Sequence, residues 1–104
     1  MGALLGRTVW GWLHVSELWV AERYRRKGIG RSLMTAAERA AVERGCYAAY
    51  LDTFDFQAVS FYELLGYSAI GALENFPFGH TRFFLQKRLI TPMRPNEPLE
   101  RQEF

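Results

Sequence analysis

The sequence predicts one α+β domain, in which two helices pack on a mixed, mostly antiparallel sheet. The chain has 104 residues, room for a single domain. Apolar residues make up 49% of it and aromatic residues 15%, enough for a buried core. Stretches of β-forming and helix-forming residues alternate up to residue 89, with glycines where helices should end. We expect the domain to occupy residues 1–90 and a proline-rich tail to occupy residues 91–104.

The first half of the chain predicts a hairpin followed by a helix. Residues 3–20 are rich in β-branched and aromatic side chains, and Gly11 marks a turn between two strands. The second strand includes residues 14–20, and its mixed polarity indicates two covered faces or a bulge. A polar, basic loop fills residues 21–28. The helix should run from about Gly30 to Arg44, because alanines and an apolar stripe recur at three- and four-residue steps. That stripe consists of Ile29, Leu33, Ala36, Ala37 and Ala40.

The second half predicts three short strands and one more helix. A strand, helix and strand in this order form a right-handed crossover with parallel strands, whereas the last two strands should be antiparallel. The expected elements are a buried strand over 47–51 with an exit loop over 52–55, a helix over 58–65, a strand over 67–70, a loop over 71–79 and a last strand over 81–89.

Composition excludes several classes of protein. No apolar run approaches the roughly 20 residues that a membrane span needs. Cys46 is the only cysteine, so we expect no internal disulfide, no metal site and a reducing, cytoplasmic location. The net charge of the whole chain is +2, and five of its thirteen basic residues lie within positions 23–31. Without that segment, the remaining eight basic and eleven acidic residues have a net charge of −3. A chain of this kind is not built to bind nucleic acid, and we expect neither nucleic-acid nor membrane partners.

The basic segment has the features of a phosphate-binding turn. A strand runs into a turn that contains Gly28 and Gly30 and that opens a helix. The first N–H groups of a helix lack partners within the helix, and its dipole adds partial positive charge there. Glycines let a ligand approach the backbone, so the turn suits a pyrophosphate. The GxxxxGK[ST] spacing is absent, and Leu33 replaces the third glycine of a dinucleotide fingerprint.

Two blocks of the sequence resemble the GNAT superfamily of N-acetyltransferases. The segment 25–30, RRKGIG, is similar to its acetyl-coenzyme A signature, [RQ]-x-x-G-x-[GA], and the segment 58–67, AVSFYELLGY, is similar to its A-x-x-F-Y-x-x-x-G-[FY] block. The resemblance covers about residues 8–89. It implies the three-layer α/β/α acyl-CoA N-acyltransferase fold in an N-terminally short form, without the first strand and helices.

The resemblance also implies the chemistry: an amine attacks the thioester of acetyl-CoA directly. Tyr62 matches the general acid that protonates the leaving thiolate. Backbone N–H groups near Trp19 and Val20 would stabilise the oxyanion. Asp55 stands where the family often has Asn, and contact with the cofactor is carried over to it. The cofactor-binding residues are Leu18, Trp19, Val20, Arg25, Arg26, Lys27, Gly28, Ile29, Gly30, Arg31, Ser32 and Asp55.

The general base and the acceptor stay open. His14, Ser16 and Glu17 are the candidates on the central strand, with His14 and Glu17 favoured as catalytic residues, and His80, before the last strand, is a weaker candidate. Simple alternation places His14 and Ser16 opposite Glu17, and a bulge would change that count. We expect an N-acetyltransferase for a primary amine of a small molecule or protein. The alternative is a truncated, catalytically weak CoA-binding or regulatory module. An open edge strand favours a homodimer.

Overall fold

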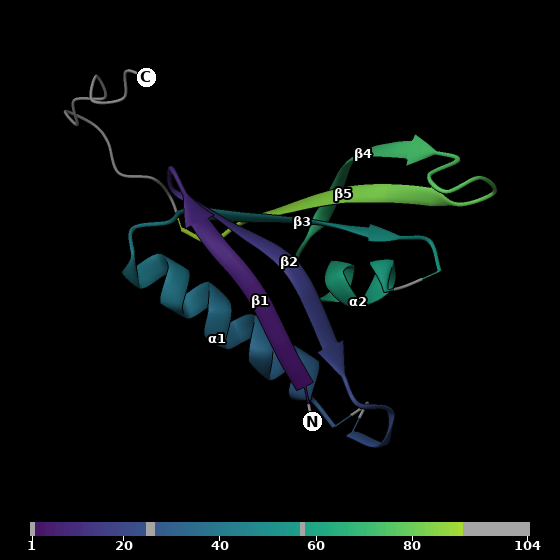
Figure 1. The fold of residues 1–104 in the computed structure, drawn as a ribbon. Helices are drawn as coiled ribbons and strands as arrows, with labels where there is room; N and C mark the ends of the chain where they lie inside the picture. Colours follow the sequence, from purple (N-terminus) through teal and green to yellow (C-terminus); the bar gives the residue numbers. More distant parts are fainter. Residues whose placement is uncertain (1, 25–26, 57, 91–104) are drawn as a thin grey trace.

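The computed structural model describes residues 2–24, 27–56 and 58–90, and it forms one mixed sheet with two α-helices (Figure 1). The predicted tail over 91–104 lies outside the described residues. The elements are β1 (Gly2–Val9), β2 (Trp12–Val20), the short 3₁₀ helix η1 (Glu22–Tyr24), α1 (Ile29–Glu43), β3 (Ala48–Phe54), α2 (Val59–Leu64), β4 (Ser68–Glu74) and β5 (Thr81–Arg88).

The five strands are ordered β1-β2-β3-β5-β4. β2 and β3 are parallel and α1 connects them, whereas all the other neighbours are antiparallel. The central parallel crossover in a mostly antiparallel sheet is therefore confirmed. The hairpin turns at Trp10 and Gly11, both with positive φ, as the sequence predicts.

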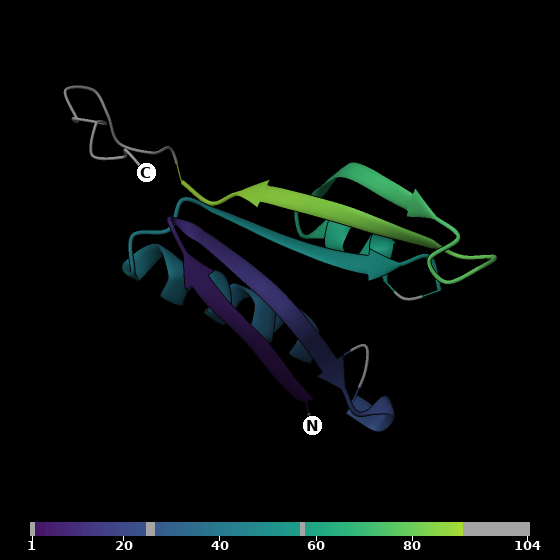
Figure 2. The same ribbon diagram turned by 45° about the horizontal axis from the view of Figure 1, so that its top comes forward.

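Both helices lie on the same face of the sheet (Figures 1 and 2). The core fills the space between them and the sheet, and its fully buried side chains include Met34, Leu51 and Leu85. No helix of the described ranges covers the opposite face, which we call the open face. The described residues thus form two of the three layers that the resemblance implies. None of their helices is long and apolar enough to cross a membrane.

Several element boundaries differ from the sequence prediction because strand pairing extends them. β3 continues beyond residue 51 as far as Phe54, which pairs with Arg82 of β5. β4 continues to Glu74, which pairs with Thr81. The buried stripe of α1 centres on Met34 and Ala41, whereas the predicted members Ala36 and Ala40 are exposed.

Candidate active site

The central feature of the site is the separation of β2 from β3. The two strands pair only from Trp12 opposite Ala48 to Val15 opposite Leu51. Beyond that point β2 stays paired with β1 and β3 stays paired with β5, and the ribbons diverge (Figure 2). A cleft of about 160 Å³ opens between them. Its lining consists of Val15, Ser16, Glu17, Leu18, Leu51, Asp52, Thr53, Ala58 and Tyr62.

A β-bulge at Ser16 decides which side chains face the cleft. Leu5 of β1 lies opposite Glu17 and Gly6 lies opposite Val15, so Ser16 is an extra residue in β2. Its hydroxyl donates a hydrogen bond of 3.2 Å to the carbonyl of Leu5. The bulge resets the alternation, because Leu18 packs against the core as Val15 does, while Glu17 is exposed.

The structure brings Glu17 and Tyr62 to one cleft and leaves His14 outside its lining. The bulge puts Glu17 on the open face with His14, whereas simple alternation predicts opposite faces. His14 instead stacks on Tyr50, with ring centroids 4.5 Å apart and an interplanar angle of 13°. Trp19 and Val20 lie further along β2 than the lining residues, and Leu18 is the cofactor candidate that the cleft includes.

Tyr62 reaches the cleft from α2, on the helix side of the sheet. Only 9% of Tyr62 is exposed, and its ring makes edge-to-face contacts with Phe61 and Tyr67. Burial raises the pKa of the Tyr62 hydroxyl above its usual 10.0, because the charged form would lose hydration. The phenol therefore stays protonated at neutral pH, which a proton donor requires.

The glycine turn leads directly into α1. Gly28 is the N-cap residue with φ of 79°, and its carbonyl accepts a hydrogen bond of 2.9 Å from the N–H of Ser32. A Cβ at Gly28 would meet nothing within 4 Å, so the backbone is open to a ligand there. Lys27, Arg31 and Ser32 are exposed around it, and Ile29 is half-buried. Arg25 and Arg26 lie outside the described residues.

Gly30 has a different environment, because it faces α2. A Cβ there would lie 3.3 Å from the Phe61 ring and 3.7 Å from Val20. The glycine therefore lets the start of α1 approach the helix that carries Tyr62. The first glycine of the pair serves the turn and the second serves helix packing.

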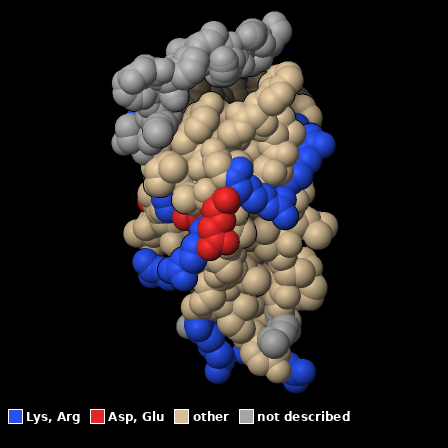
Figure 3. All heavy atoms as spheres, turned by 90° about the vertical axis from the view of Figure 1, so that its left-hand side faces the viewer, with Lys and Arg blue, Asp and Glu red and all other residues tan. Residues whose placement is uncertain are grey.

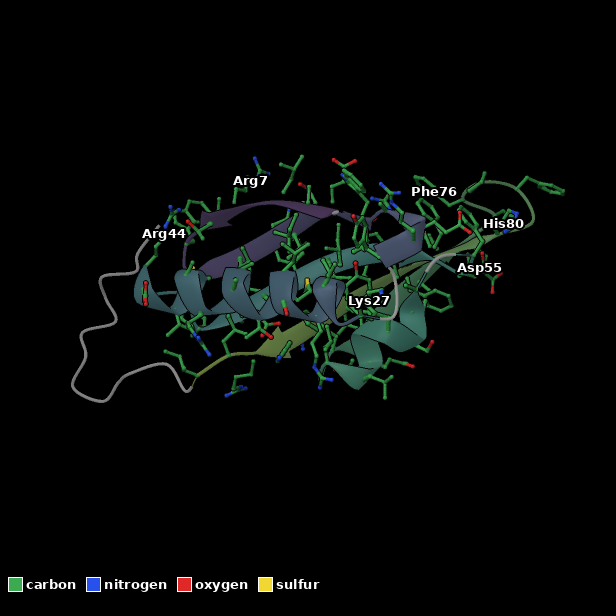
Figure 4. All side chains as sticks on the ribbon, turned by 90° about the horizontal axis from the view of Figure 1, so that it is seen from below. Arg7, Lys27, Arg44, Asp55, Phe76 and His80 are labelled. Carbon is green, nitrogen blue, oxygen red and sulfur yellow. The ribbon has the colours of Figure 1, made fainter. Side chains whose placement is uncertain are left out.

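The basic side chains extend beyond the turn. Arg7, Arg39, Arg44 and Arg88 are also exposed, and Figure 3 shows blue side chains along the length of one face with acidic groups between them. Arg7 and Arg44 lie far from Lys27 in Figure 4. The exposed basic side chains are therefore not confined to the cluster at positions 23–31.

Asp55 lies with His80 and apart from Lys27 (Figure 4). Its Oδ1 is 3.1 Å from the Nδ1 of His80, and its Oδ2 accepts a hydrogen bond of 3.0 Å from the N–H of Thr81. Its carboxylate thus holds the loop between β4 and β5 against the end of β3.

Sequence reasoning missed Asp52, because it assigned this residue to an exit loop. Asp52 lies within β3 and lines the cleft, and its Oδ2 accepts a hydrogen bond of 2.7 Å from the Nε of Arg82. The alternation of Tyr50, Asp52 and Phe54 with the buried Leu51 and Thr53 is the signal that extends the strand.

The mixed sheet, its two central parallel strands that separate at one end, and the helix that begins at a glycine turn match the acyl-CoA N-acyltransferase fold. The family model for the acetyltransferase (GNAT) family matches residues 1–67. The chain therefore belongs to the acetyltransferase (GNAT) family.

Individual relatives agree with this assignment. The chain is 42% identical over 89 residues to a blasticidin-S acetyltransferase of Streptomyces morookaense and 41% identical over 87 residues to an acetyltransferase of Agrobacterium fabrum. These matches cover 85% and 84% of this chain, and 65% and 64% of the relatives. The chain thus spans just under two thirds of the curated relatives it matches. A crystal structure of an acetyltransferase from Bacillus cereus superimposes with a TM-score of 0.80 at 40% identity, covering 84% of this chain and 62% of that one.

Proposed function

We propose that this protein transfers the acetyl group of acetyl-CoA to a primary amine, by direct attack of the amine on the thioester. The observation that carries the proposal is the cleft between β2 and β3, which has a buried phenol and an exposed carboxylate in its lining, Tyr62 and Glu17. Membership of the acetyltransferase family supports the reaction class.

The turn at the start of α1 is proposed to bind the pyrophosphate of acetyl-CoA. The N–H groups of the first helical turn, around residues 28–31, donate to the phosphate oxygens, and the helix dipole favours the negative charge. The open backbone at Gly28 and the exposed Lys27 and Arg31 support this role. Arg25 and Arg26 remain predicted contacts, as does Asp55, whose carboxylate already bonds to His80 and Thr81.

Glu17 and Tyr62 are proposed to move the two protons of the reaction. Glu17 takes a proton from the acceptor's ammonium group, directly or through a water, and leaves the neutral amine to attack. The nitrogen–carbon bond forms, the carbon–sulfur bond breaks, and Tyr62 donates its proton to the departing thiolate. The amide nitrogen then gives up its extra proton, which returns through water to the Tyr62 phenolate. Backbone N–H groups of β2 that face the cleft stabilise the oxyanion. We favour Glu17 over His14 as the base, because Glu17 lines the cleft and His14 does not.

For the acceptor, the relatives favour a small molecule over a protein. A curated relative at 42% identity is named as a blasticidin-S acetyltransferase, so blasticidin S is the first acceptor to test. Other small primary amines and peptides with a free α-amine complete the panel.

The test has two parts. Calorimetry with acetyl-CoA measures cofactor binding, and release of the coenzyme A thiol in the presence of the amine panel measures transfer. We expect both, and we expect Tyr62→Phe to lower transfer while binding persists. Binding without transfer to any amine would instead support the CoA-binding module, and absence of binding would contradict both functions.

The assembly and the location are also proposals. Among the described strands β1 lies at one edge of the sheet, and its Leu5 is 57% exposed. Open edges favour pairing, so we propose a homodimer that pairs or covers this edge. Light scattering at tens of micromolar protein checks it, and a monomer would contradict it. A cytoplasmic location is proposed from the single, buried Cys46.

A further inference from the structure

We propose that Asp52 binds the ammonium group of the acceptor and that Arg82 positions it. The inference deepens the proposed function and rests on it for the identity of the cleft. Asp52 is one of the two carboxylates in the cleft lining, and its position in β3 fixes the face from which it acts.

The strand pairing places Asp52 on the open face. Leu51 lies opposite Leu85 of β5, and both side chains are fully buried on the helix side. Neighbouring residues of a strand project to opposite faces, so Asp52 and its partner Phe84 project to the open face. Glu17 reaches the same face through the bulge at Ser16.

The cleft therefore joins the two faces of the sheet. Tyr62 and Ala58 line it from the helix side, which also holds the glycine turn at the start of α1. Asp52 and Glu17 line it from the open side. A cofactor that enters from the helix side would present its thioester to an amine that enters from the open side.

Arg82 holds the carboxylate of Asp52 in one orientation. Its Nε donates to Oδ2 at 2.7 Å. Its guanidinium lies 4.7 Å from the ring centroid of Phe76, 5.1 Å from that of Phe84 and 5.8 Å from that of Phe54. Three rings around one guanidinium restrict its motion and add cation–π attraction. Only one carboxylate oxygen is used in this contact, and a carboxylate has about four lone-pair sites, so Oδ1 has the capacity to bind an ammonium group.

Charge and aromatic surface define the class of acceptor. Asp52 and Arg82 form a neutral pair, and Glu17 adds one negative charge, so the mouth of the cleft favours a single cation. Tyr50 lies two residues before Asp52 on the same face and is 38% exposed. His14 covers one side of the Tyr50 ring, and the exposed remainder offers a surface for a flat ring, so the acceptor class that fits is a primary amine joined to such a ring by a short arm.

The proposal is tested by binding, so that turnover is not needed. The probes are 2-phenylethylamine and its uncharged analogue 2-phenylethanol, titrated into the full chain with coenzyme A present and followed by NMR. We expect the wild-type protein to bind the amine at least about tenfold more tightly than the alcohol, which is the scale of one charge-assisted contact. Asp52→Asn should reduce that preference to less than about twofold. Glu74→Gln removes an exposed carboxylate of β4 outside the cleft lining and should keep the preference.

The role of Arg82 as a positioning residue is tested by comparing how its variants bind the amine and the alcohol. Arg82→Lys keeps the positive charge beside Asp52 but loses the planar guanidinium that orients the carboxylate, so it should weaken amine binding while leaving alcohol binding unchanged. If Asp52→Asn fails to fold because Arg82 loses its partner, the double variant Asp52→Asn with Arg82→Met removes both charges and provides the same comparison.

Equal binding of the amine and the alcohol to the wild-type protein would overturn the proposal. So would an amine preference that survives in Asp52→Asn, or no binding of either probe. Amine preference without acetyl transfer would contradict the proposed function alone, whereas transfer with an unchanged acceptor KM in Asp52→Asn would contradict this inference alone.

Discussion

The hydroxyl of Tyr67 donates a hydrogen bond of 2.8 Å to the Oε2 of Glu38. The other oxygen of the same carboxylate, Oε1, accepts one of 2.9 Å from the Nζ of Lys87. Glu38 thereby connects α1 to β5 and to Tyr67, the residue before β4. Tyr67 also makes an edge-to-face contact with Tyr62, so the network supports the ring that lines the cleft.

This network predicts a loss of stability at alkaline pH. Burial first, and then hydrogen bonding to Glu38, raise the pKa of Tyr67 far above its usual 10.0. Between pH 10 and the folded pKa, the unfolded chain releases the Tyr67 proton while the folded chain keeps it. The free energy of unfolding therefore falls as pH rises through this range, whereas the contribution is complete below pH 10. Melting temperatures between pH 8 and 11 measure the slope.

Tyr67→Phe should reduce the alkaline slope and leave the part that the raised pKa of Tyr62 contributes. The variant should also lose about 1–3 kcal/mol of stability at neutral pH, since Glu38 loses a hydrogen-bond donor in a half-buried position. Tyr24→Phe, in η1, is the matched control and should keep the wild-type slope. Equal slopes in Tyr67→Phe and the wild-type protein would show that Tyr67 does not control alkaline stability.

The positive φ of Gly28 predicts that two substitutions of similar size, to Val and to Asn, will differ in stability and in acetyl-CoA binding. Its φ is 79°, which most side chains disfavour but which Asn tolerates. Because a Cβ would meet nothing within 4 Å, the cost is in the backbone and not in packing. We expect Gly28→Val to lose about 1–2 kcal/mol of stability and to weaken acetyl-CoA binding, as the strained turn relaxes. Gly28→Asn should stay close to the wild-type protein in thermal melts and calorimetry. Similar behaviour of both variants would argue against the turn geometry as the cause.

Gly30 predicts coupling between the start of α1 and the helix that carries Tyr62. A Cβ at Gly30 would lie 3.3 Å from Phe61, whose ring contacts that of Tyr62 at a centroid distance of 5.1 Å. Gly30→Val should displace Phe61, destabilise the protein by about 1–3 kcal/mol and lower kcat. Phe61→Leu makes room, so the double variant should recover part of the loss. A double-mutant cycle of stability measures the coupling, and strictly additive effects would exclude the contact as the cause.

The sequence predicts the order of the elements well, because local signals determine it. Gly45 and Gly66 both have positive φ just beyond the two helices, where the sequence predicts helix ends. Periodicity predicts α1, and the crossover rule then makes β2 and β3 parallel. The helix ends and the periodicity depend on neighbours within a few residues, and the crossover rule depends only on the order of the elements.

The sequence predicts the site less completely, because strand pairing over long distances builds it. Residues 52–54 read as a loop until Arg82, Phe83 and Phe84 of β5 pair with them. The bulge at Ser16 depends on how β1 pairs with β2. The alternation of residues along β2 alone therefore does not reveal its position. The family motif marks Tyr62, but only the fold brings Glu17 and Asp52 to the same cleft.

Tyr62→Phe isolates the proposed proton donor. The substitution removes one hydroxyl and keeps the ring that packs between Phe61 and Tyr67, so the fold should persist. Burial raises the Tyr62 pKa, so the phenol is fully protonated from pH 6 to 9, and its loss should lower kcat by a similar factor throughout that range. We expect a decrease of about 10²-fold with the Kd of acetyl-CoA within about twofold of the wild-type value. Thiol release gives kcat and calorimetry gives Kd. Tyr47→Phe, outside the cleft lining, is the control with unchanged kcat. A kcat of Tyr62→Phe within twofold of the wild-type value would mean that another group, or water, protonates the thiolate.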